Sequence, residues 1–350
     1  MPNSRYLATF APGFEPVIGD LLADDVPRSE LIRIESGMAL FDYRGTVAEA
    51  AYPSFFNNVF LVLREWKSSA LSFPDMVKGV AAVSKIADAR DACRALGVTT
   101  FRVRYSRENV FASVDKKLMD QAERFIAAGT GLAPDRFDPG IEFWFIIRRE
   151  GYACFALRLT KKQSTEKYLA PGELRPETVR LVTALARVDP LARTLLDPFA
   201  GHGSIPAALA SLRPQAAVFA SDQDAALVAA MEKRFRDMPQ INVRQCDALS
   251  LAHVADSSVD AIVTDPPWGE WEGGSFGKAA SLSELYRGML AEFSRVLAPT
   301  ARACVLTGAK REFEAVVGES PFFAQSAARE GFRTDILVNG KKCAVYVIYR

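Results

Sequence analysis

Strand-like and helix-like patterns of apolar residues alternate through the C-terminal half of the chain, from about Pro176 onward. Apolar runs typical of strands lie at 193–199, 216–221, 241–246, 260–265 and 301–308. Helix-like stretches lie among them at 204–212, 225–237 and 281–297. This alternation predicts an α/β domain in which helices cover both faces of a parallel sheet.

The end of the chain follows a different pattern. Two apolar runs flank the pair Asn339-Gly340 within the segment FRTDILVNGKKCAVYVIYR. Asn-Gly between two alternating runs is a strong signal for a two-residue β-hairpin. We therefore expect an antiparallel hairpin to complete the parallel sheet.

The N-terminal half mixes short strand-like segments with helix-like ones, which predicts an α+β arrangement. Strand-like segments lie at 5–10, 37–43, 60–66, 99–106, 141–150 and 153–160, and helix-like ones at 87–96 and 114–128. We predict a first domain at 1–70, a second at 71–162, a linker at 163–176 and a C-terminal domain at 177–350.

Composition narrows the class of protein. The 350 residues are 49% hydrophobic and 24% charged, which is typical of a soluble globular protein. No apolar run reaches the ~18 residues that a membrane helix needs, and the first residues lack the layout of a signal peptide. The net charge of +1 argues against an indiscriminate nucleic-acid binder but permits a local basic surface.

The five cysteines are dispersed and form no CxxC pair. Such a set predicts reduced thiols and a cytoplasmic protein. Because the chain also has only two histidines, we expect no zinc site.

A glycine loop follows the first strand of the C-terminal domain, in the segment LLDPFAGHGSIPAALA. Gly201 and Gly203 allow a tight turn and a close approach of the backbone to a ligand. A GxG loop alone is weak evidence, because many strand–loop–helix turns contain one for packing. Asp197, however, lies at the carboxyl end of the strand, where open α/β sheets bind ligands. The loop lacks the dinucleotide and phosphate-loop motifs, so a ligand without phosphates fits it better.

Carboxylates also follow the next two strands. Asp222, about twenty residues after the glycine loop, is placed to accept hydrogen bonds from ribose hydroxyls, and Asp224 is interpreted as a helix cap. Asp247 can accept a hydrogen bond from an adenine amino group, although a cap or turn role explains it equally well. The expected cofactor site comprises Asp197, Pro198, Ala200, Gly201, Gly203, Asp222, Gln223, Asp247, Ala248 and Asp265.

The tetrapeptide Asp265-Pro266-Pro267-Trp268 directly follows the fourth strand. The exocyclic amine of a base is a poor nucleophile, because its lone pair is delocalised into the ring. The Asp265 carboxylate and the Pro266 carbonyl can accept hydrogen bonds from the two N–H groups of such an amine, while Trp268 stacks on the base. The expected catalytic residues are Asp265, Pro266, Pro267 and Trp268. The alternative is a proline turn with a packing tryptophan.

These motifs occur in the order DPFAGHGSIP, SDQD, CDA and DPPWG, which resembles class I amino-methyltransferases with an (N/D/S)PP(Y/F/W) motif. The N-terminal segments ATFAPGFEP, TTFRVRYSRENV and GIEFWFIIRREGYACFALRLT, followed by LAPGELRPETV, resemble the ferredoxin-like and THUMP module of tRNA and rRNA guanine 2-amino methyltransferases. The resemblance covers nearly the whole chain. It departs from the family in the linker and in the Trp that ends the tetrapeptide.

The resemblance implies a Rossmann-like methyltransferase domain at 177–350, a ferredoxin-like domain at 1–70 and a THUMP-like RNA-binding domain at 71–162. It also implies S-adenosylmethionine as the cofactor. The implied reaction is methyl transfer to the 2-amino group of a guanine in structured RNA, with tRNA favoured as the substrate.

Basic residues in the N-terminal half are candidates for holding that RNA. Arg102 and Arg104 alternate along a strand and share a face. The expected RNA-binding residues are Arg102, Arg104, Arg107, Lys161, Lys162 and Lys167, with Arg148, Arg149 and Arg158 nearby in sequence. Ordinary solvated surfaces explain these charges equally well, because glutamates are interspersed.

Three other functions are compatible with the motifs. In the first, the target is a guanine in rRNA. In the second, the target is the amino group of an adenine in DNA; enzymes of that kind need a target-recognition domain, and the THUMP-like N-terminal half argues against one. The third is an RNA-binding protein with a degenerate methyltransferase fold, against which the intact motifs argue.

Overall fold

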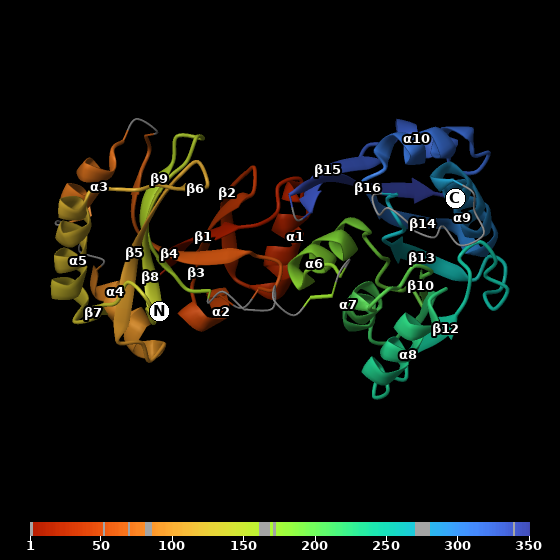
Figure 1. Cartoon of the computed structure of the whole chain (residues 1–350), viewed down its shortest axis with the longest axis horizontal. Helices are drawn as coiled ribbons and strands as arrows, with labels where there is room; N and C mark the ends of the chain where they lie inside the picture. The colour runs from red at the N-terminus through yellow and green to blue at the C-terminus, as the bar shows by residue number, and fades with distance from the viewer. Residues whose placement is uncertain are drawn as a thin grey trace. The chain divides into compact units, whose positions relative to one another are not determined.

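The computed structural model describes residues 3–51, 53–68, 71–80, 86–160, 169–170, 173–269, 281–338 and 340–350. The chain divides into two compact units (Figure 1). The N-terminal unit comprises Met1–Phe10 and Ile18–Gln163, and the C-terminal unit comprises Ala11–Val17 and Ser164–Arg350.

The N-terminal unit is built on one nine-stranded sheet with the order β2-β3-β1-β4-β9-β8-β5-β6, in which β7 also pairs with β5. The strands are β1 (Ser4–Thr9), β2 (Ser29–Glu35), β3 (Met38–Tyr43), β4 (Asn58–Trp66), β5 (Thr100–Arg107), β6 (Val110–Phe111), β7 (Ala133–Pro134), β8 (Ile141–Ile147) and β9 (Ala153–Arg158). The helices are α1 (Glu15–Asp25), α2 (Val47–Ala51), α3 (Phe73–Val80), α4 (Ile86–Ala95) and α5 (Lys116–Thr130). The unit is therefore α+β, as predicted.

Strands from before and after residue 70 share this sheet, because β4 pairs with β9. The β5 and β8 strands are parallel to each other, whereas β8 and β9 are antiparallel. The boundary between a ferredoxin-like domain at 1–70 and a THUMP-like domain at 71–162 remains a prediction.

Strand β5 shows why two faces of this sheet differ. Its apolar residues Phe101, Val103 and Tyr105 are buried, and β5 packs on α5. Arg102 and Arg104 alternate with them and remain partly exposed. Side chains of successive strand residues point to opposite faces, so the two arginines share the second face.

The C-terminal unit contains a seven-stranded sheet with the order β12-β11-β10-β13-β14-β16-β15. The strands are β10 (Thr194–Asp197), β11 (Ala217–Asp222), β12 (Ile241–Gln245), β13 (Val259–Thr264), β14 (Leu297–Thr307), β15 (Arg333–Val338) and β16 (Lys341–Tyr349). The helices are α6 (Pro176–Leu185), α7 (Ser204–Leu212), α8 (Ala225–Arg234), α9 (Leu282–Val296), α10 (Lys310–Glu319) and the 3₁₀ helix η2 (Ala324–Ala328).

Five parallel strands and a terminal antiparallel hairpin form this sheet, which is the Rossmann-like arrangement that the sequence predicted. Val338 pairs with Lys341, so the hairpin turns at the predicted place. Helices α6 and α7 pack together on one face, and α9 and α10 pack together on the other (Figure 1).

Strand β2 and helix α10 are examples of observed elements that the sequence-based prediction lacks. Strand β2 is mostly exposed or half-buried and lacks a clear alternation of apolar residues. Helix α10 is short, and its buried face consists of Phe313, Val316 and Val317. Both give only a weak periodic signal, which tertiary packing overrides.

Four of the five cysteines, Cys93, Cys154, Cys304 and Cys343, are buried, and Cys246 is half-buried. In the part of the chain that the structure describes, no helix is both long enough and apolar enough to span a lipid bilayer.

Candidate active site

The candidate site lies at the carboxyl ends of four neighbouring parallel strands, β12, β11, β10 and β13. Asp197 ends β10, Asp222 ends β11, and Asp265 directly follows β13. Because the carboxyl ends of parallel strands meet at one edge of a sheet, residues far apart in the sequence converge here.

The glycine loop is hydrogen-bonded to the end of β11. The amide of Gly201 donates to Asp222 Oδ2 at 2.9 Å, and the amide of Ala200 donates to the carbonyl of Ser221 at 2.9 Å. The other carboxylate oxygen of Asp222 accepts from the amide of Asp224 at 3.0 Å. The structure therefore brings the loop and Asp222 together, and Asp222 also shapes the loop.

The two glycines of the loop differ in their surroundings. Both have positive φ, 51° at Gly201 and 83° at Gly203. A Cβ atom at Gly203 would lie 2.6 Å from the ring of Phe235, whereas one at Gly201 would meet no described atom within 4 Å. Gly203 is thus required for packing against the end of α8, and Gly201 leaves space for a ligand beside the loop.

Two acids near this loop have local structural roles. Asp224 caps α8 by accepting hydrogen bonds from the amides of Ala226 and Leu227, which confirms the cap interpretation. Asp247 Oδ1 accepts from the amide of Leu249 at 2.9 Å, which is a turn contact.

The remaining predicted cofactor residues flank these contacts. Pro198 and Ala248 are buried, and Ala200 is also buried within the loop. Gln223 is exposed, and its carbonyl accepts a hydrogen bond from the side chain of Gln245 at 3.0 Å. Contacts of these residues with a cofactor remain predictions.

Asp197 is almost fully buried and has an incompletely satisfied carboxyl group. Its Oδ1 accepts from the hydroxyl of Thr264 at 2.6 Å and from the amide of Phe199 at 3.2 Å. Its Oδ2 has no hydrogen-bond partner among the described atoms. Burial raises the pKa of Asp197 to about 7, opposed by the two hydrogen bonds and assisted by the charge of Asp222. An unpartnered buried oxygen beside the glycine loop indicates a position for a hydrogen-bond donor.

The Asp265 carboxyl and the Trp268 indole form a pair. Trp268 Nε1 donates to Asp265 Oδ1 at 2.8 Å. Burial of the carboxyl group raises the pKa of Asp265 to about 8, the Trp268 hydrogen bond opposes that rise, and the nearby Asp197 adds to it. Trp268 also packs on Gly308, where a Cβ atom would lie 2.8 Å from the indole ring. The indole therefore positions the carboxyl group in addition to offering a surface for stacking.

The two proline carbonyls of the tetrapeptide differ, because that of Pro267 accepts a hydrogen bond from Tyr286 Oη at 2.9 Å. The Pro267 carbonyl is therefore bound within the protein. Tyr286 Oη also lies 2.8 Å from Thr307 Oγ1, which in turn accepts from the amide of Ala309 at 3.0 Å. This chain of hydrogen bonds attaches the tetrapeptide to the end of β14.

Sequence reasoning missed Tyr286, which lies 19 residues beyond Pro267 on α9. A signal for it exists, because Tyr286 belongs to the apolar buried face of that helix. A tyrosine in such a face usually directs its hydroxyl at a hydrogen-bond partner.

We predict that Tyr286→Phe lowers the rate of the reaction at this site. The substitution leaves the Pro267 carbonyl without its hydrogen-bond donor. Loss of one such hydrogen bond should lower the free energy of unfolding by about 1–2 kcal/mol. Because the tetrapeptide can then shift, the turnover rate should fall by up to about 100-fold with little change in cofactor affinity. Steady-state kinetics and calorimetry would measure the two effects.

Tyr346→Phe is the matched control, because it removes a tyrosine hydroxyl bound to Glu314 at 2.6 Å in the same unit. It should lose stability but keep its turnover rate. Equal losses of activity in the two variants would show that Tyr286 is merely structural.

A second residue missed by sequence reasoning is Glu173. Its Oε1 accepts from the hydroxyl of Ser204 at 3.1 Å, at the start of α7, and its Oε2 accepts from the amide of Ala170 at 3.2 Å. Glu173 thus holds the segment before α6 beside the glycine loop.

Of the predicted RNA-binding residues, Arg102, Arg104 and Arg107 are described and belong to the N-terminal unit. Arg102 and Arg104 share a face with Glu142, and Arg102 Nε donates to Glu142 Oε1 at 2.6 Å. Arg107 is separate from this group, because its guanidinium donates to the carbonyl of Leu71 at 3.1 Å. Lys161, Lys162 and Lys167 lie outside the described residues.

Comparison with known proteins identifies the C-terminal unit. Residues 164–337 match the family UPF0020, described as an RMKL-like methyltransferase domain. A release factor glutamine methyltransferase from Bacteroides thetaiotaomicron is 36% identical over 103 residues, which are 29% of this chain and 37% of that relative. A methyltransferase domain therefore occupies residues 164–337.

Two solved structures share the fold of the whole chain. TrmN from Thermus thermophilus superposes with a TM-score of 0.77 at 22% identity, covering 99% of each chain. SMU.472, solved as a complex with SAH, superposes with a TM-score of 0.70 at 14% identity, covering 100% of this chain and 98% of that one. The cofactor of the methyltransferase domain is S-adenosylmethionine.

Proposed function

We propose that this protein transfers the methyl group of S-adenosylmethionine to the exocyclic 2-amino group of a guanine in structured RNA, with tRNA as the favoured substrate. The observation that carries the proposal is the half-buried Asp265 carboxyl group, which Trp268 orients at the strand end beside the glycine loop. At this edge of the sheet, a carboxylate can accept hydrogen bonds from an amine and an aromatic ring lies beside it. This combination suits a base whose exocyclic amine reacts with the cofactor.

Three carboxylates would hold the cofactor. The unpartnered Oδ2 of Asp197 fits the ammonium group of the methionine part, and the Asp222 carboxylate, already at the glycine loop, fits the ribose hydroxyls. Asp247 would accept from the adenine amine. The open space beside Gly201 is where the ligand can approach the backbone. When bound, the cofactor supplies an electrophilic methyl group.

The reaction needs a nitrogen with an available lone pair. The deprotonated Asp265 would accept one hydrogen of the amine, and the Pro266 carbonyl would accept the other. These contacts strengthen as positive charge develops on nitrogen, so they stabilise the transition state more than the ground state. Tyr286 positions the loop by binding the neighbouring carbonyl. The target base must leave its helix to reach this site.

Two observations favour RNA as the substrate. The N-terminal half resembles the RNA-binding module of guanine 2-amino methyltransferases, and its nine-stranded unit carries an arginine cluster on one sheet face. The dispersed cysteines of the chain suit a reaction in the cytoplasm, where thiols stay reduced. The match to a release factor glutamine methyltransferase favours a second candidate, a glutamine side-chain amide, whose nitrogen lone pair is also delocalised.

The test is transfer of labelled methyl groups to unfractionated tRNA, rRNA, duplex DNA and a glutamine-containing release factor in parallel. We expect label in RNA and N2-methylguanosine as the product nucleoside by mass spectrometry. Label in DNA adenine or in protein glutamine would replace the proposed substrate. Cofactor binding without transfer to any of them would indicate a degenerate enzyme.

We predict that Trp268→Ala lowers methyl transfer strongly, whereas Trp268→Phe retains substantial activity because its ring can still stack. Phenylalanine cannot donate to Asp265, however, and the Trp268 hydrogen bond lowers the pKa of that carboxyl group. The pH–rate profile of Trp268→Phe should therefore move to higher pH. Identical profiles in Trp268→Phe and the wild type would exclude this electrostatic role.

A further inference from the structure

We propose that the sheet face formed by β5, β8, β9 and β6 binds an unpaired nucleotide of the RNA substrate. An arginine cluster of Arg102, Arg104 and Arg158 would bind a phosphate, and Phe111 would stack on the base. The inference rests on the proposed function, since it places part of the RNA on the N-terminal unit.

The arginine cluster surrounds one carboxylate. Arg158 Nη1 donates a hydrogen bond to Glu142 Oε2 at 2.9 Å, and Arg102 Nε donates one to Glu142 Oε1 at 2.6 Å. Arg104 forms an ion pair with the same carboxylate, with 3.6 Å between Arg104 Nε and Glu142 Oε1. Burial works to raise the pKa of Glu142, but hydrogen bonds from Arg158, Arg102 and Trp144 outweigh it and hold the pKa below its usual range. Glu142 is therefore ionised, and it balances only part of the positive charge.

The cluster also has unused donors. The Nε atoms of Arg104 and Arg158 are buried and have no hydrogen-bond partner among the described atoms. The side chain of Arg158 is only 13% exposed, so its charge is largely shielded from water. Guanidinium groups whose charge is only partly balanced and which are partly desolvated favour a phosphate, which they can bind through several donors.

An aromatic series leads from this cluster to the surface. The buried Phe60 contacts Trp144 edge-on at 5.5 Å, and Trp144 lies 5.4 Å from Phe111. Phe111 is 66% exposed, and the guanidinium of Arg104 lies over its ring at 5.4 Å. The preceding residue, Val110, is also largely exposed. An exposed ring beside a cationic cluster matches the combination of stacking and charge by which proteins bind single-stranded nucleic acid.

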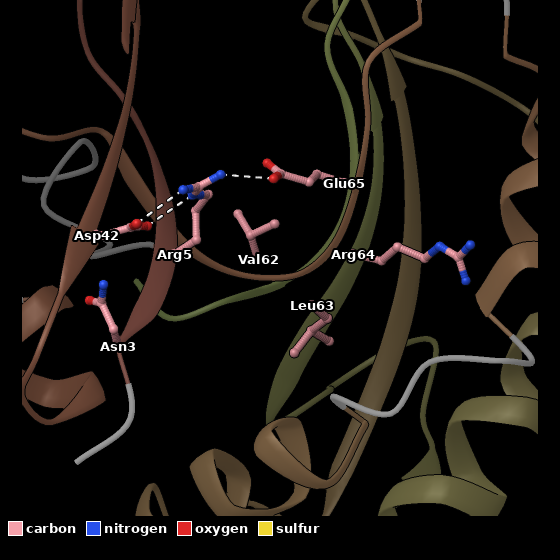
Figure 2. Close-up of a pocket in the computed structure, with 7 residues that line it drawn as sticks. All are labelled: Asn3, Arg5, Asp42, Val62, Leu63, Arg64 and Glu65. Carbon is pink, nitrogen blue, oxygen red and sulfur yellow. Dashed lines mark hydrogen bonds and ion pairs between the residues drawn. The ribbon is translucent and has the colours of Figure 1, made fainter. Parts of the chain in front are cut away.

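A cavity elsewhere in the N-terminal unit has a balanced charge, with two arginines and two carboxylates in its lining. It encloses about 350 Å³ and is lined by Asn3, Arg5, Asp42, Val62, Leu63, Arg64 and Glu65. Figure 2 shows Arg5 between Asp42 and Glu65, with ion-pair distances of 2.8 Å to each, and Arg64 directed away from it. Two carboxylates on one guanidinium disfavour a phosphate, so this cavity is a poor candidate for holding RNA.

The test uses a fluorescein-labelled RNA strand of about ten nucleotides and its duplex form, a length within the usual range for stacking proteins. Fluorescence anisotropy of the full chain would give affinities at several salt concentrations. We expect Phe111→Ala to weaken binding of the single strand about 5- to 150-fold without changing its salt dependence, since one stacking contact is lost. Arg104→Gln should weaken binding and reduce the salt slope by about one phosphate contact.

Matched controls exist in the same unit. Phe137 is 96% exposed, and Arg149 is an exposed partner of Glu108. Phe137→Ala and Arg149→Gln should bind the single strand like the wild type. Affinities for the single strand that are the same in Phe111→Ala and Phe137→Ala would overturn the stacking role, and an unchanged salt slope in Arg104→Gln would overturn the phosphate role.

Methylation measured on the same variants separates this inference from the proposed function. If the Phe111 and Arg104 variants bind and methylate RNA like the wild type, the nucleotide site is wrong and the proposed function stands. If the variants show the expected loss of binding while wild-type protein methylates no RNA, the proposed function fails.

Discussion

Asp265→Ala is expected to lower the single-turnover rate of methyl transfer by about 100–1000-fold, the usual effect of removing one preorganised transition-state contact. The fold should survive, because Asp265 lies after the end of β13 and its described partner is the nearby Trp268. Cofactor affinity should change far less than the rate. Rapid-quench transfer to a guanine-containing RNA, together with calorimetry of cofactor binding, measures both.

The pH dependence provides a second test of Asp265. Its pKa is raised to about 8, and only the deprotonated group accepts both the indole and an amine. The wild-type rate should therefore rise with pH toward 8 and then level off, whereas Asp265→Asn should lack this rise.

The free energy of unfolding should change with pH in the direction opposite to that of the rate. The folded protein holds a proton on Asp265 that the unfolded chain loses near pH 4, so the free energy of unfolding should fall as pH rises from about 4 to 8. Asp265→Asn should become progressively more stable relative to the wild type over this range.

A wild-type transfer rate in Asp265→Ala would make Asp265 a structural residue.

Asp222→Ala is expected to weaken S-adenosylmethionine binding by about 1.5–3 kcal/mol, the range for hydrogen bonds to a charged group. The substitution removes the proposed ribose acceptor and also the acceptor for the Gly201 amide. Both losses should weaken binding of the cofactor, and neither removes a group that contacts the target amine. Isothermal titration of the purified variant gives the affinity directly.

Asp224→Ala is the matched control, since Asp224 lies two residues away and caps α8. It should cost about 1 kcal/mol of stability, as loss of a cap does, and leave cofactor affinity close to wild type. If a folded Asp222→Ala protein binds the cofactor normally, Asp222 does not belong to the cofactor site.

Local patterns in the sequence predicted the architecture of the C-terminal unit. The helix at 204–212 agrees with α7, and the Asn339-Gly340 signal predicted the hairpin of β15 and β16. These features depend on neighbours in the chain, such as an apolar period, a glycine with positive φ or a two-residue turn. The position of Asp197, Asp222 and Asp265 at one sheet edge also followed, because parallel strands place their carboxyl ends together.

Long-range contacts were not predictable in this way. The need for glycine at 203 comes from Phe235 at the C-terminal end of α8, and the carbonyl of Pro267 is bound by Tyr286 from α9. The sequence pattern located Arg102 and Arg104 on one face, but only the pairing of β5 with β8 places Glu142 among them. Side chains from separate elements meet only when the sheets and helices pack. The polypeptide sequence therefore specified which groups are present at each strand end, and tertiary structure decided which of them are neutralised, oriented or left with unused hydrogen-bonding atoms.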